Sequence, residues 1–269
     1  MTIEKTIKNA FKLTGIGIHS GQKVSIECLP QKAQKGIQFI RNHISIPVTA
    51  KNIMNGQRAT HLHYQDTQVH TPEHLLAALA GLGITALTIK LSANEVPIFD
   101  GSAEPFVNAI KTAGIQALDQ EINAISIKNQ LRVEDNDAHI IAIPATQMSF
   151  SFCLAYPNTF IGSQMVHFNP QEDAFETEIA PARTYGFLNE YEALLKQGLA
   201  KGANSENAII IGDTDYQSKL RFNDELARHK LLDLMGDLWI LGRPINAHII
   251  GFKSGHALTH KLIQKIAEQ

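Results

Sequence analysis

Alternating apolar and polar residues dominate the opening third of the chain and predict β-strands. The alternation is clearest at 23–30 (KVSIECLP) and 35–42 (KGIQFIRN), with glycine and proline between the runs. The preceding stretch, 13–24 (LTGIGIHSGQKV), lacks the GxxxxGKS/T spacing of a phosphate-binding loop and does not lead into a helix. We therefore expect a tight glycine turn between two strands, which directs His19 towards a cleft.

The periodicity becomes that of a helix at 71–83 (TPEHLLAALAGLG). Thr71 suits the N-cap, Pro72 suits the first helical position, and two glycines end the segment. A strand, a turn-rich loop and a second helix are then expected at 86–92, 94–102 and 104–114.

The same order of elements starts again in the second half of the chain. Its strands and helices are expected at 124–135, 138–145, 148–157, 191–202 (helix), 207–213, 223–241 (helix), 246–254 and 256–269 (helix). Each half therefore has strands, a helix, a strand and a helix, with the boundary near 117–124. Two α+β halves that face one another would enclose a cleft, which is a common location for small-molecule sites.

The amino-acid composition argues against nucleic-acid-binding, membrane-spanning and secreted proteins. With 269 residues, 44% apolar residues and a net charge of −2, the chain can bury a sizeable core and carries no general signal for nucleic acid or an anionic membrane. No stretch approaches the roughly 20 apolar residues of a membrane span, and no secretory signal is visible. Cys28 and Cys153 lack a CxxC pattern, which favours free thiols in the cytoplasm. Twelve histidines invite a search for a metal site.

The long helix at 223–241 contains an unusual polar face. His229, Asp233 and Asp237 follow one another at intervals of four residues and fan across about 80° of the helix. On this segment alone, a solvated face and a functional site are equally good interpretations. A second cluster, Glu73 and His74, lies in the first turn of the helix at 71–83, where the helix dipole favours the acid but not the histidine.

Together these clusters predict a metal centre. His74, His229 and Asp233 would supply three ligands, which is the usual number in a catalytic zinc site that leaves one position for water. Glu73 is adjacent to a ligand and could take a proton from the metal-bound water. Asp237 could orient another histidine, and His256 in KSGHAL is available at the start of the last helix.

Other histidines offer a competing set. His61 and His63 would share one face of a strand, and His70 lies four residues before His74. No carboxylate follows them at helical spacing, and the segment looks like a surface hairpin. The remaining histidines are interpreted as ordinary surface or packing residues: His43, His139, His167, His248 and His260.

Six motifs occur in the order GIGIHSG, TPEHLLAALAGLGI, VPIFDGSAEPFV, ARTYGF, LRFNDELARHKLLDLMGDL and KSGHAL. Together they resemble the UDP-3-O-acyl-N-acetylglucosamine deacetylases, zinc amidases that perform the committed step of lipid A synthesis. The resemblance runs from about residue 6 to residue 265. It implies two similar α+β domains, each a layer of helices on a mostly antiparallel sheet, with the active site in the cleft between them. The domains would be 1–120, with an insert at about 36–62, and 121–269, with an insert at about 184–222.

The resemblance also implies roles for individual residues. The zinc ligands map onto the trio reached from spacing: His74, His229 and Asp233. Glu73 matches the general base and His256 the general acid, with Asp237 supporting the acid. Thr184 in ARTYGF matches a threonine that helps stabilise the oxyanion.

Substrate contacts are implied in the same way. Lys230 matches a lysine beside the substrate sugar or phosphate, Phe160 an aromatic that stacks on the uracil, and Lys253 a residue near the diphosphate. Tyr185 and Phe187 belong to ARTYGF, and Tyr185 stands where the family often has Phe. The segment GLAKGANSENA departs from the family's GLxxGGSLxNA near the acyl passage, so the resemblance does not specify the acyl length.

The expected reaction removes the N-acetyl group from UDP-3-O-(3-hydroxyacyl)-N-acetylglucosamine and releases acetate. We expect one Zn²⁺ per chain, although Fe²⁺ could use the same ligands. The resemblance implies a cytoplasmic monomer without nucleic-acid partners and with at most transient contact with the membrane surface. Two rival interpretations are a metal hydrolase acting on a different amide or ester and a catalytically silent paralog that binds the sugar nucleotide. A purely structural protein would need all these residues to coincide by accident.

Overall fold

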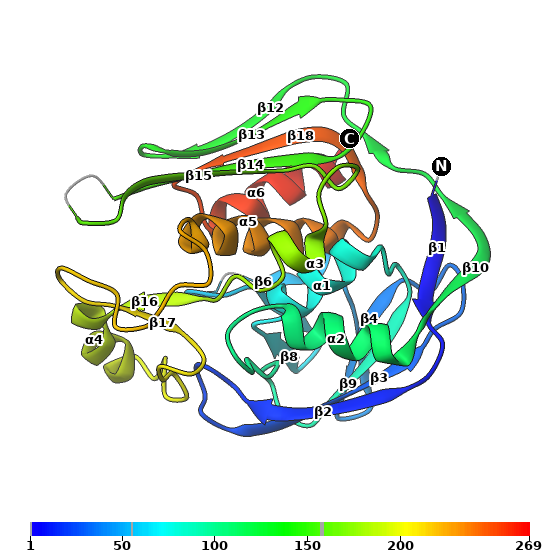
Figure 1. The fold of residues 1–269 in the computed structure, drawn as a ribbon. Helices are drawn as coiled ribbons and strands as arrows, with labels where there is room; N and C mark the ends of the chain where they lie inside the picture. Colours follow the sequence, from blue (N-terminus) through cyan, green and yellow to red (C-terminus); the bar gives the residue numbers. More distant parts are fainter. Residues whose placement is uncertain (1, 55, 157–158) are drawn as a thin grey trace.

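The computed structural model describes residues 2–54, 56–156 and 159–269, and it confirms an α+β fold in which the main helices lie between two β-sheets (Figure 1). One sheet lies above the helices in this view and the other lies below them. The helices of the central layer are α1 (Glu73–Leu82), α2 (Glu104–Ala113), α5 (Glu225–Leu238) and α6 (His256–Ala267). The shorter helices are α3 (Phe175–Glu178) and α4 (Tyr191–Lys196).

The two large sheets have the same strand order. The lower sheet runs β2 (Phe11–Ile16), β3 (Lys23–Pro30), β9 (Leu87–Leu91), β4 (Ile37–Arg41) and β5 (Ile44–Pro47). The upper sheet runs β12 (Leu131–Asp135), β13 (Ala138–Pro144), β18 (Ile245–Phe252), β14 (Ser149–Tyr156) and β15 (Gly162–Phe168). In each sheet the last strand in sequence lies at the centre, parallel to one neighbour and antiparallel to the other. Both sheets are therefore mixed, with mostly antiparallel pairs.

Smaller strands complete the fold. A two-stranded sheet pairs β1 (Thr2–Ile7) with β10 (Ile115–Ile122), and β11 (Ile125–Ser126) pairs with β18. A three-stranded sheet contains β6 (Ile53–Met54), β7 (His61–Tyr64) and β8 (Thr67–His70). A parallel pair joins β16 (Tyr185–Phe187) to β17 (Ile209–Ile211), beside α4 in Figure 1.

Alternating side chains explain how the sheets face the helices. In β3 the buried residues are Val24, Ile26 and Cys28, while their neighbours are partly or fully exposed. In β18 the residues Ile245, Ala247, Ile249 and Gly251 alternate with less buried ones. Because strand side chains point to opposite faces with period two, each sheet presents one apolar face to the helical layer.

Helices α1 and α5 are buried on nearly all sides, and they cross in close contact. A Cβ atom added at Gly236 would lie only 2.1 Å from the backbone oxygen of Glu73. The two helix backbones therefore approach more closely than any residue with a side chain would allow. This contact places the first turn of α1 beside the polar residues of α5.

The structure changes several predicted boundaries. Thr71 is not the N-cap of α1: its φ is 55°, its hydroxyl points to Glu95, and Pro72 occupies the cap position. The predicted strand at 124–135 is two strands, β11 and β12, because the intervening residues turn. The predicted helix at 191–202 ends as α4 at Lys196, and a Gly198 with positive φ follows.

The long predicted helix at 223–241 begins at Glu225 and continues into a 3₁₀ turn, Trp239–Leu241. His229, Asp233 and Asp237 are all buried, so the interpretation of a solvated face is wrong. The predicted glycine turn is confirmed, since β2 and β3 form an antiparallel pair on either side of it.

The two expected inserts lie in different parts of the fold. Within 36–62, β4 and β5 belong to the lower sheet, whereas β6 and the start of β7 belong to the three-stranded sheet. Within 184–222, β16, α4 and β17 lie outside both large sheets. In the described residues, no helix has the length and apolar character needed to cross a membrane.

Replacing Gly236 by alanine should destabilise the protein. At a solvent-exposed position inside a helix, replacing glycine by alanine stabilises the folded state by about 1 kcal/mol. At position 236, however, the added methyl group meets the Glu73 carbonyl. Overpacking of this kind costs roughly 1–3 kcal/mol or more, so the melting temperature should fall by about 5 °C. Thermal unfolding measures this shift. Gly186→Ala is the matched control, since its Cβ would meet nothing within 4 Å, and an equal loss in both variants would contradict the explanation.

Candidate metal centre and active site

His74 on α1 and His229 and Asp233 on α5 form a buried group of three potential metal ligands. One potential ligand atom from each residue lies within 4.8 Å of the others. Oδ1 of Asp233 is 3.5 Å from Nε2 of His74 and 3.4 Å from Nε2 of His229. The two imidazole rings meet edge to face, with their centroids 4.9 Å apart. The sequence-based expectation that these three side chains converge is confirmed.

Among the described residues, two buried polar atoms of this group have no hydrogen-bond partner, as expected of a site that binds a cation. Within the part of the chain that the structure describes, Oδ1 of Asp233 and Nδ1 of His74 are buried without a hydrogen-bond partner. A buried carboxylate oxygen without a donor is costly, and a metal ion between the carboxylate and the two rings would remove that cost. Two imidazoles and one carboxylate suit zinc, although Fe²⁺ can use such a set as well.

His229 is held in the form that a metal ligand requires. Its Nδ1 lies 3.1 Å from the carbonyl oxygen of Ala182, so Nδ1–H donates to that oxygen and Nε2 carries the free lone pair. Burial lowers the pKa of His229 to about 3, against the raising effect of Asp233. The imidazole is therefore neutral at physiological pH.

Asp233 uses its second oxygen differently. Nζ of Lys230 donates to Oδ2 at 2.8 Å, which leaves Oδ1 for the two histidines. Burial by itself would raise the pKa of Asp233, but His229, Lys230 and His74 outweigh it and hold that pKa well below its usual range. Lys230 also lies 5.9 Å from the ring centre of Tyr185.

Glu73 stands next to this group at the first position of α1. Its Oε2 accepts a hydrogen bond from the backbone N–H of Thr60, with a distance of 3.2 Å. Burial raises the pKa of Glu73 to about 7, although His256 and His74 act in the opposite direction. A carboxylate with a pKa near neutrality is well suited to accept and release a proton.

His256, the first residue of α6, faces Glu73 from the opposite side. Its Nδ1 donates to Oδ2 of Asp237 at 2.7 Å, and its Nε2 lies 3.9 Å from Oε1 of Glu73 and 3.9 Å from Oδ2 of Asp233. Burial would lower the pKa of His256, but Asp237 and Glu73 raise it to about 9. The geometry therefore brings a protonated imidazole opposite the Glu73 carboxyl group.

Thr184 reaches the site on a segment anchored to α5. The neighbouring Arg183 forms a buried ion pair with Glu225 at 2.8 Å, and its backbone N–H also donates to Glu225. Because Ala182 in the same segment accepts the His229 hydrogen bond, the segment that carries Thr184 is attached to α5 through both Ala182 and Arg183.

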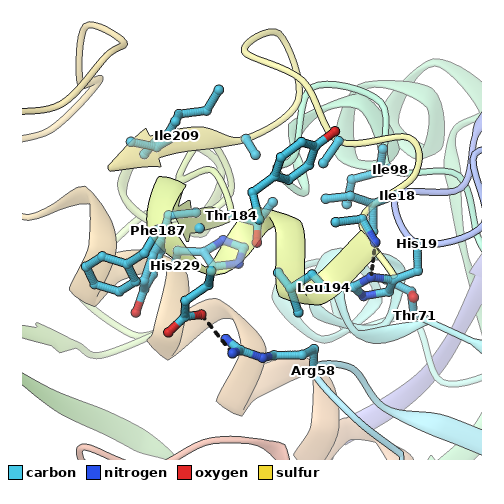
Figure 2. A pocket seen from close by; sticks show the side chains of 18 of the residues that line it. Ile18, His19, Arg58, Thr71, Ile98, Thr184, Phe187, Leu194, Ile209 and His229 are labelled. Atoms are coloured by element: carbon cyan, nitrogen blue, oxygen red, sulfur yellow. Dashed lines mark hydrogen bonds and ion pairs between the residues drawn. The ribbon is translucent and has the colours of Figure 1, made fainter. Parts of the chain in front are cut away.

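These residues line a cavity of about 460 Å³ (Figure 2). The expected residues that line it are Glu73, His74, His229, Asp233, His256, Thr184, Lys230, Tyr185, Phe187 and His19. Apolar side chains form much of the remaining wall: Ile18, Ile98, Leu188, Leu194, Ala200 and Ile209. Figure 2 labels Thr184 and His229 among the lining residues, and it shows Arg58, whose guanidinium pairs with Glu190 at 2.7 Å. The hydroxyl of Tyr185, which the sequence left unexplained, lies 3.3 Å from that of Tyr156.

Three expected residues lie outside the cavity wall. Asp237 is behind His256 and reaches the cavity only through it. Phe160 is exposed and packs edge to face against Tyr216. Lys253 forms an ion pair with Asp137 at 2.6 Å. The substrate contacts expected of Phe160 and Lys253 remain predictions.

The competing histidine set does not converge on a third ligand among the described residues. His61 stacks on His70 with ring centroids 4.3 Å apart, while His63 is exposed on the same hairpin. The group that does converge is the one on α1 and α5.

Sequence reasoning missed two buried residues beside the site. The Thr60 hydroxyl donates to Asp237, and Nε2 of His260 lies 2.8 Å from the Thr60 hydroxyl oxygen. His260 was interpreted as an ordinary packing residue, and its spacing of four from His256 was the available signal. Thr60 gave no signal, because a lone threonine before a strand has no functional pattern.

Comparison with known proteins gives a consistent result over the full chain. Residues 4–268 match the family described as UDP-3-O-acyl N-acetylglycosamine deacetylase. A UDP-3-O-acyl-N-acetylglucosamine deacetylase from Leptospira biflexa is 38% identical, covering 98% of this chain and 90% of that protein. Proteins with the same description from Myxococcus xanthus and Thermosynechococcus vestitus are 37% and 38% identical, covering 98% and 100% of this chain and 86% and 95% of their own lengths.

Removal of a ligand should abolish metal binding. We expect Asp233→Asn and His229→Ala to lose zinc, with affinity lowered more than about 100-fold, because loss of an outer-shell partner alone costs roughly 10- to 100-fold. Metal analysis of the purified proteins after dialysis measures this. His63→Ala is the control and should retain the wild-type metal content. Zinc retained in Asp233→Asn but lost in His63→Ala would favour the competing histidine set.

Proposed function

The chain belongs to the UDP-3-O-acyl-N-acetylglucosamine deacetylase family, and from this premise we propose that it hydrolyses the N-acetyl group of UDP-3-O-(3-hydroxyacyl)-N-acetylglucosamine in lipid A biosynthesis. The observation that supports this most strongly is the meeting of His74, His229 and Asp233 beside Glu73 and His256. A silent paralog would have no physical need for all five groups. The products would be acetate and the free amine.

Two residues beside the three candidate metal ligands would carry out the proton transfers, one as acceptor and one as donor. A bound Zn²⁺, held by His74, His229 and Asp233, would polarise the acetamide carbonyl and make water more acidic. Glu73 would accept the proton of the attacking water, since its Oε1 faces the site while Oε2 is held by the Thr60 N–H. Burial keeps the carboxylate poorly solvated and therefore basic enough to do so.

His256 would supply the proton to the leaving nitrogen. It is held in the protonated form by Asp237, and its Nε2 faces the same space as Oε1 of Glu73. As the C–N bond breaks, the nitrogen takes this proton and departs as the amine. Thr184 would donate its hydroxyl hydrogen to the carbonyl oxygen as negative charge develops there, a contribution of roughly 3 kcal/mol for such a donor.

The cavity wall supports the substrate assignment. Apolar residues such as Ile18, Ile98 and Leu194 would accommodate the 3-O-acyl chain, which needs a water-free surface. Lys230 and His19 line the same cavity and would contact the polar sugar and phosphate groups. We assign Tyr185 and Phe187 to the wall near the sugar, and Phe160 and Lys253 to the uracil and diphosphate.

The chain organisation fits this function. We propose two similar domains, 1–120 and 121–269, with inserts at about 36–62 and 184–222 and the substrate cleft between them. The shared strand order of the two large sheets supports such a duplication. The proposed enzyme is a cytoplasmic monomer with zinc as its metal, in keeping with the two free cysteines.

The central test is metal-dependent release of acetate. We expect purified protein to release acetate from UDP-3-O-(3-hydroxyacyl)-N-acetylglucosamine, to lose this activity with a chelator and to regain it with zinc. Glu73→Gln should lower kcat by about 10²- to 10⁴-fold, the usual contribution of a general base. Equal activity on an acylated sugar without UDP would favour the rival metal hydrolase, and binding without acetate release would favour the silent paralog.

The two opposed protonation states predict a bell-shaped pH profile. Activity should rise with pH as Glu73 loses its proton near pH 7 and fall as His256 loses its proton near pH 9. Measurement of kcat/KM against pH tests this, since it reports the groups of the free enzyme. His256→Gln should have low activity without the alkaline limb. A profile without either limb would contradict the assigned roles.

A further inference from the structure

Thr60 is fully buried at the point where α1, α5 and α6 meet, although it does not line the cavity. It lies just before β7. Its carbonyl oxygen accepts a hydrogen bond from the backbone N–H of Thr71 at 3.0 Å, so the residue is fixed to the segment that leads into α1. A polar side chain in such a place needs an explanation.

The contacts of Thr60 reach both proposed proton-transfer groups. Its backbone N–H donates to Oε2 of Glu73 at 3.2 Å. Its hydroxyl forms a short hydrogen bond with Oδ1 of Asp237, and Nε2 of His260 lies 2.8 Å from the same hydroxyl oxygen. A single residue therefore contacts the proposed base, Glu73, and the hydrogen-bond partner of the proposed acid, Asp237.

The direction of these hydrogen bonds follows from the number of protons. The Asp237 carboxylate can only accept, so the Thr60 hydroxyl must donate its one hydrogen to Oδ1. Its oxygen is then free to accept from His260. Burial lowers the pKa of His260, although Asp237 acts against this, so His260 is a neutral imidazole with one N–H. That hydrogen must be on Nε2.

These contacts form a continuous series of hydrogen bonds that runs from His260 through Thr60 and Asp237 to His256. Both oxygens of Asp237 are engaged, Oδ1 by Thr60 and Oδ2 by Nδ1 of His256 at 2.7 Å. A carboxylate held at both oxygens cannot rotate, and the imidazole bonded to it is fixed with Nε2 towards Glu73. Partners of this kind commonly affect activity by orienting the groups that react.

We propose that Thr60 is a positioning residue that fixes the proposed base and acid relative to one another, and that His260 fixes the direction of its hydroxyl hydrogen. This inference rests on the proposed deacetylase function. The backbone N–H sets the orientation of Glu73. The hydroxyl sets the orientation of Asp237 and thereby of His256, whose Nδ1 also lies 3.4 Å from the hydroxyl oxygen. Substitution of the side chain therefore disturbs only the acid side of the pair.

The first experiment compares Thr60→Val with Thr60→Ser in the zinc-loaded protein. Valine keeps the shape and the backbone N–H but removes the hydroxyl, so kcat should fall by roughly 10- to 100-fold with little change in KM. Serine restores the hydroxyl and should recover most of kcat. Thr85→Val is the matched control, because Thr85 is also buried and accepts a backbone hydrogen bond, from Lys5, outside the cavity wall. Zinc content and melting temperature are measured for each variant.

The second experiment observes the hydrogen bonds without turnover. In ¹⁵N-histidine-labelled, zinc-loaded protein, the Nδ1 proton of His256 should give a downfield resonance that is absent from His256→Gln. Thr60→Val should shift or broaden this resonance, whereas Thr60→Ser and Thr85→Val should leave it in place. Because this signal does not require acetate release, a wild-type protein that fails to deacetylate the substrate refutes the proposed function and not the positioning role.

The following outcomes of these experiments would overturn the positioning role of Thr60 or of His260. If Thr60→Val keeps the wild-type kcat and resonance, or if Thr60→Ser is as impaired as Thr60→Val, the hydroxyl has no positioning role. If Thr60→Val does not fold, His260→Leu and His260→Gln decide the question. Leucine removes the donor to Thr60 and should lower kcat several-fold, while glutamine, which can still donate, should be closer to wild type. Equal kcat in these two variants overturns the role of His260.

Discussion

The contact between α1 and α5 at Gly236 is the constraint on which the site depends. Because the Glu73 carbonyl oxygen occupies the space that a side chain at 236 would need, the two helices approach at backbone distance. His74 then lies within reach of His229 and Asp233. Metal–ligand distances tolerate deviations of only about 0.2 Å, so a displacement of one helix by the width of a methyl group would move the three candidate ligands out of reach of a common ion.

Burial gives the groups in this contact their chemical character. The same lack of water raises the pKa of Glu73 to about 7 and lowers that of His229 to about 3. His256 has the opposite pKa shift to His229, although desolvation lowers the pKa of both rings, because Asp237 bonds directly to Nδ1 of His256. One histidine is thereby kept neutral as a potential ligand, and the other is kept protonated opposite a carboxyl group. The difference arises from the hydrogen-bond partner, a carbonyl oxygen or a carboxylate.

The two large sheets and the segments outside them have different structural roles. The sheets bury both sides of the helical layer and so enclose the contact between α1 and α5. Segments outside the sheets build the cavity: β16 and α4 contribute apolar wall residues, and the glycine turn after β2 contributes Ile18 and His19. This arrangement allows the wall to differ in shape without movement of the residues that we propose as the base and the acid.

Sequence alone determined the class of fold, most elements and the candidate ligands. Alternation gave the strands, and the four-residue spacing of His229 and Asp233 placed both on one helix face, since these relations are local. Local patterns failed at Thr71, whose hydroxyl and backbone N–H contact the distant residues Glu95 and Thr60, and at the face of α5, which is buried by other parts of the fold.

Only the tertiary structure decided that Thr60 and His260 join the site. Their contacts link residues 177 and 200 positions apart, and no sequence period encodes such a distance. Residue type and spacing therefore determined which groups were available for the chemistry. The packing of helices from opposite ends of the chain determined their orientation, their hydrogen-bond partners and their protonation, because these properties depend on neighbours that only folding brings into contact.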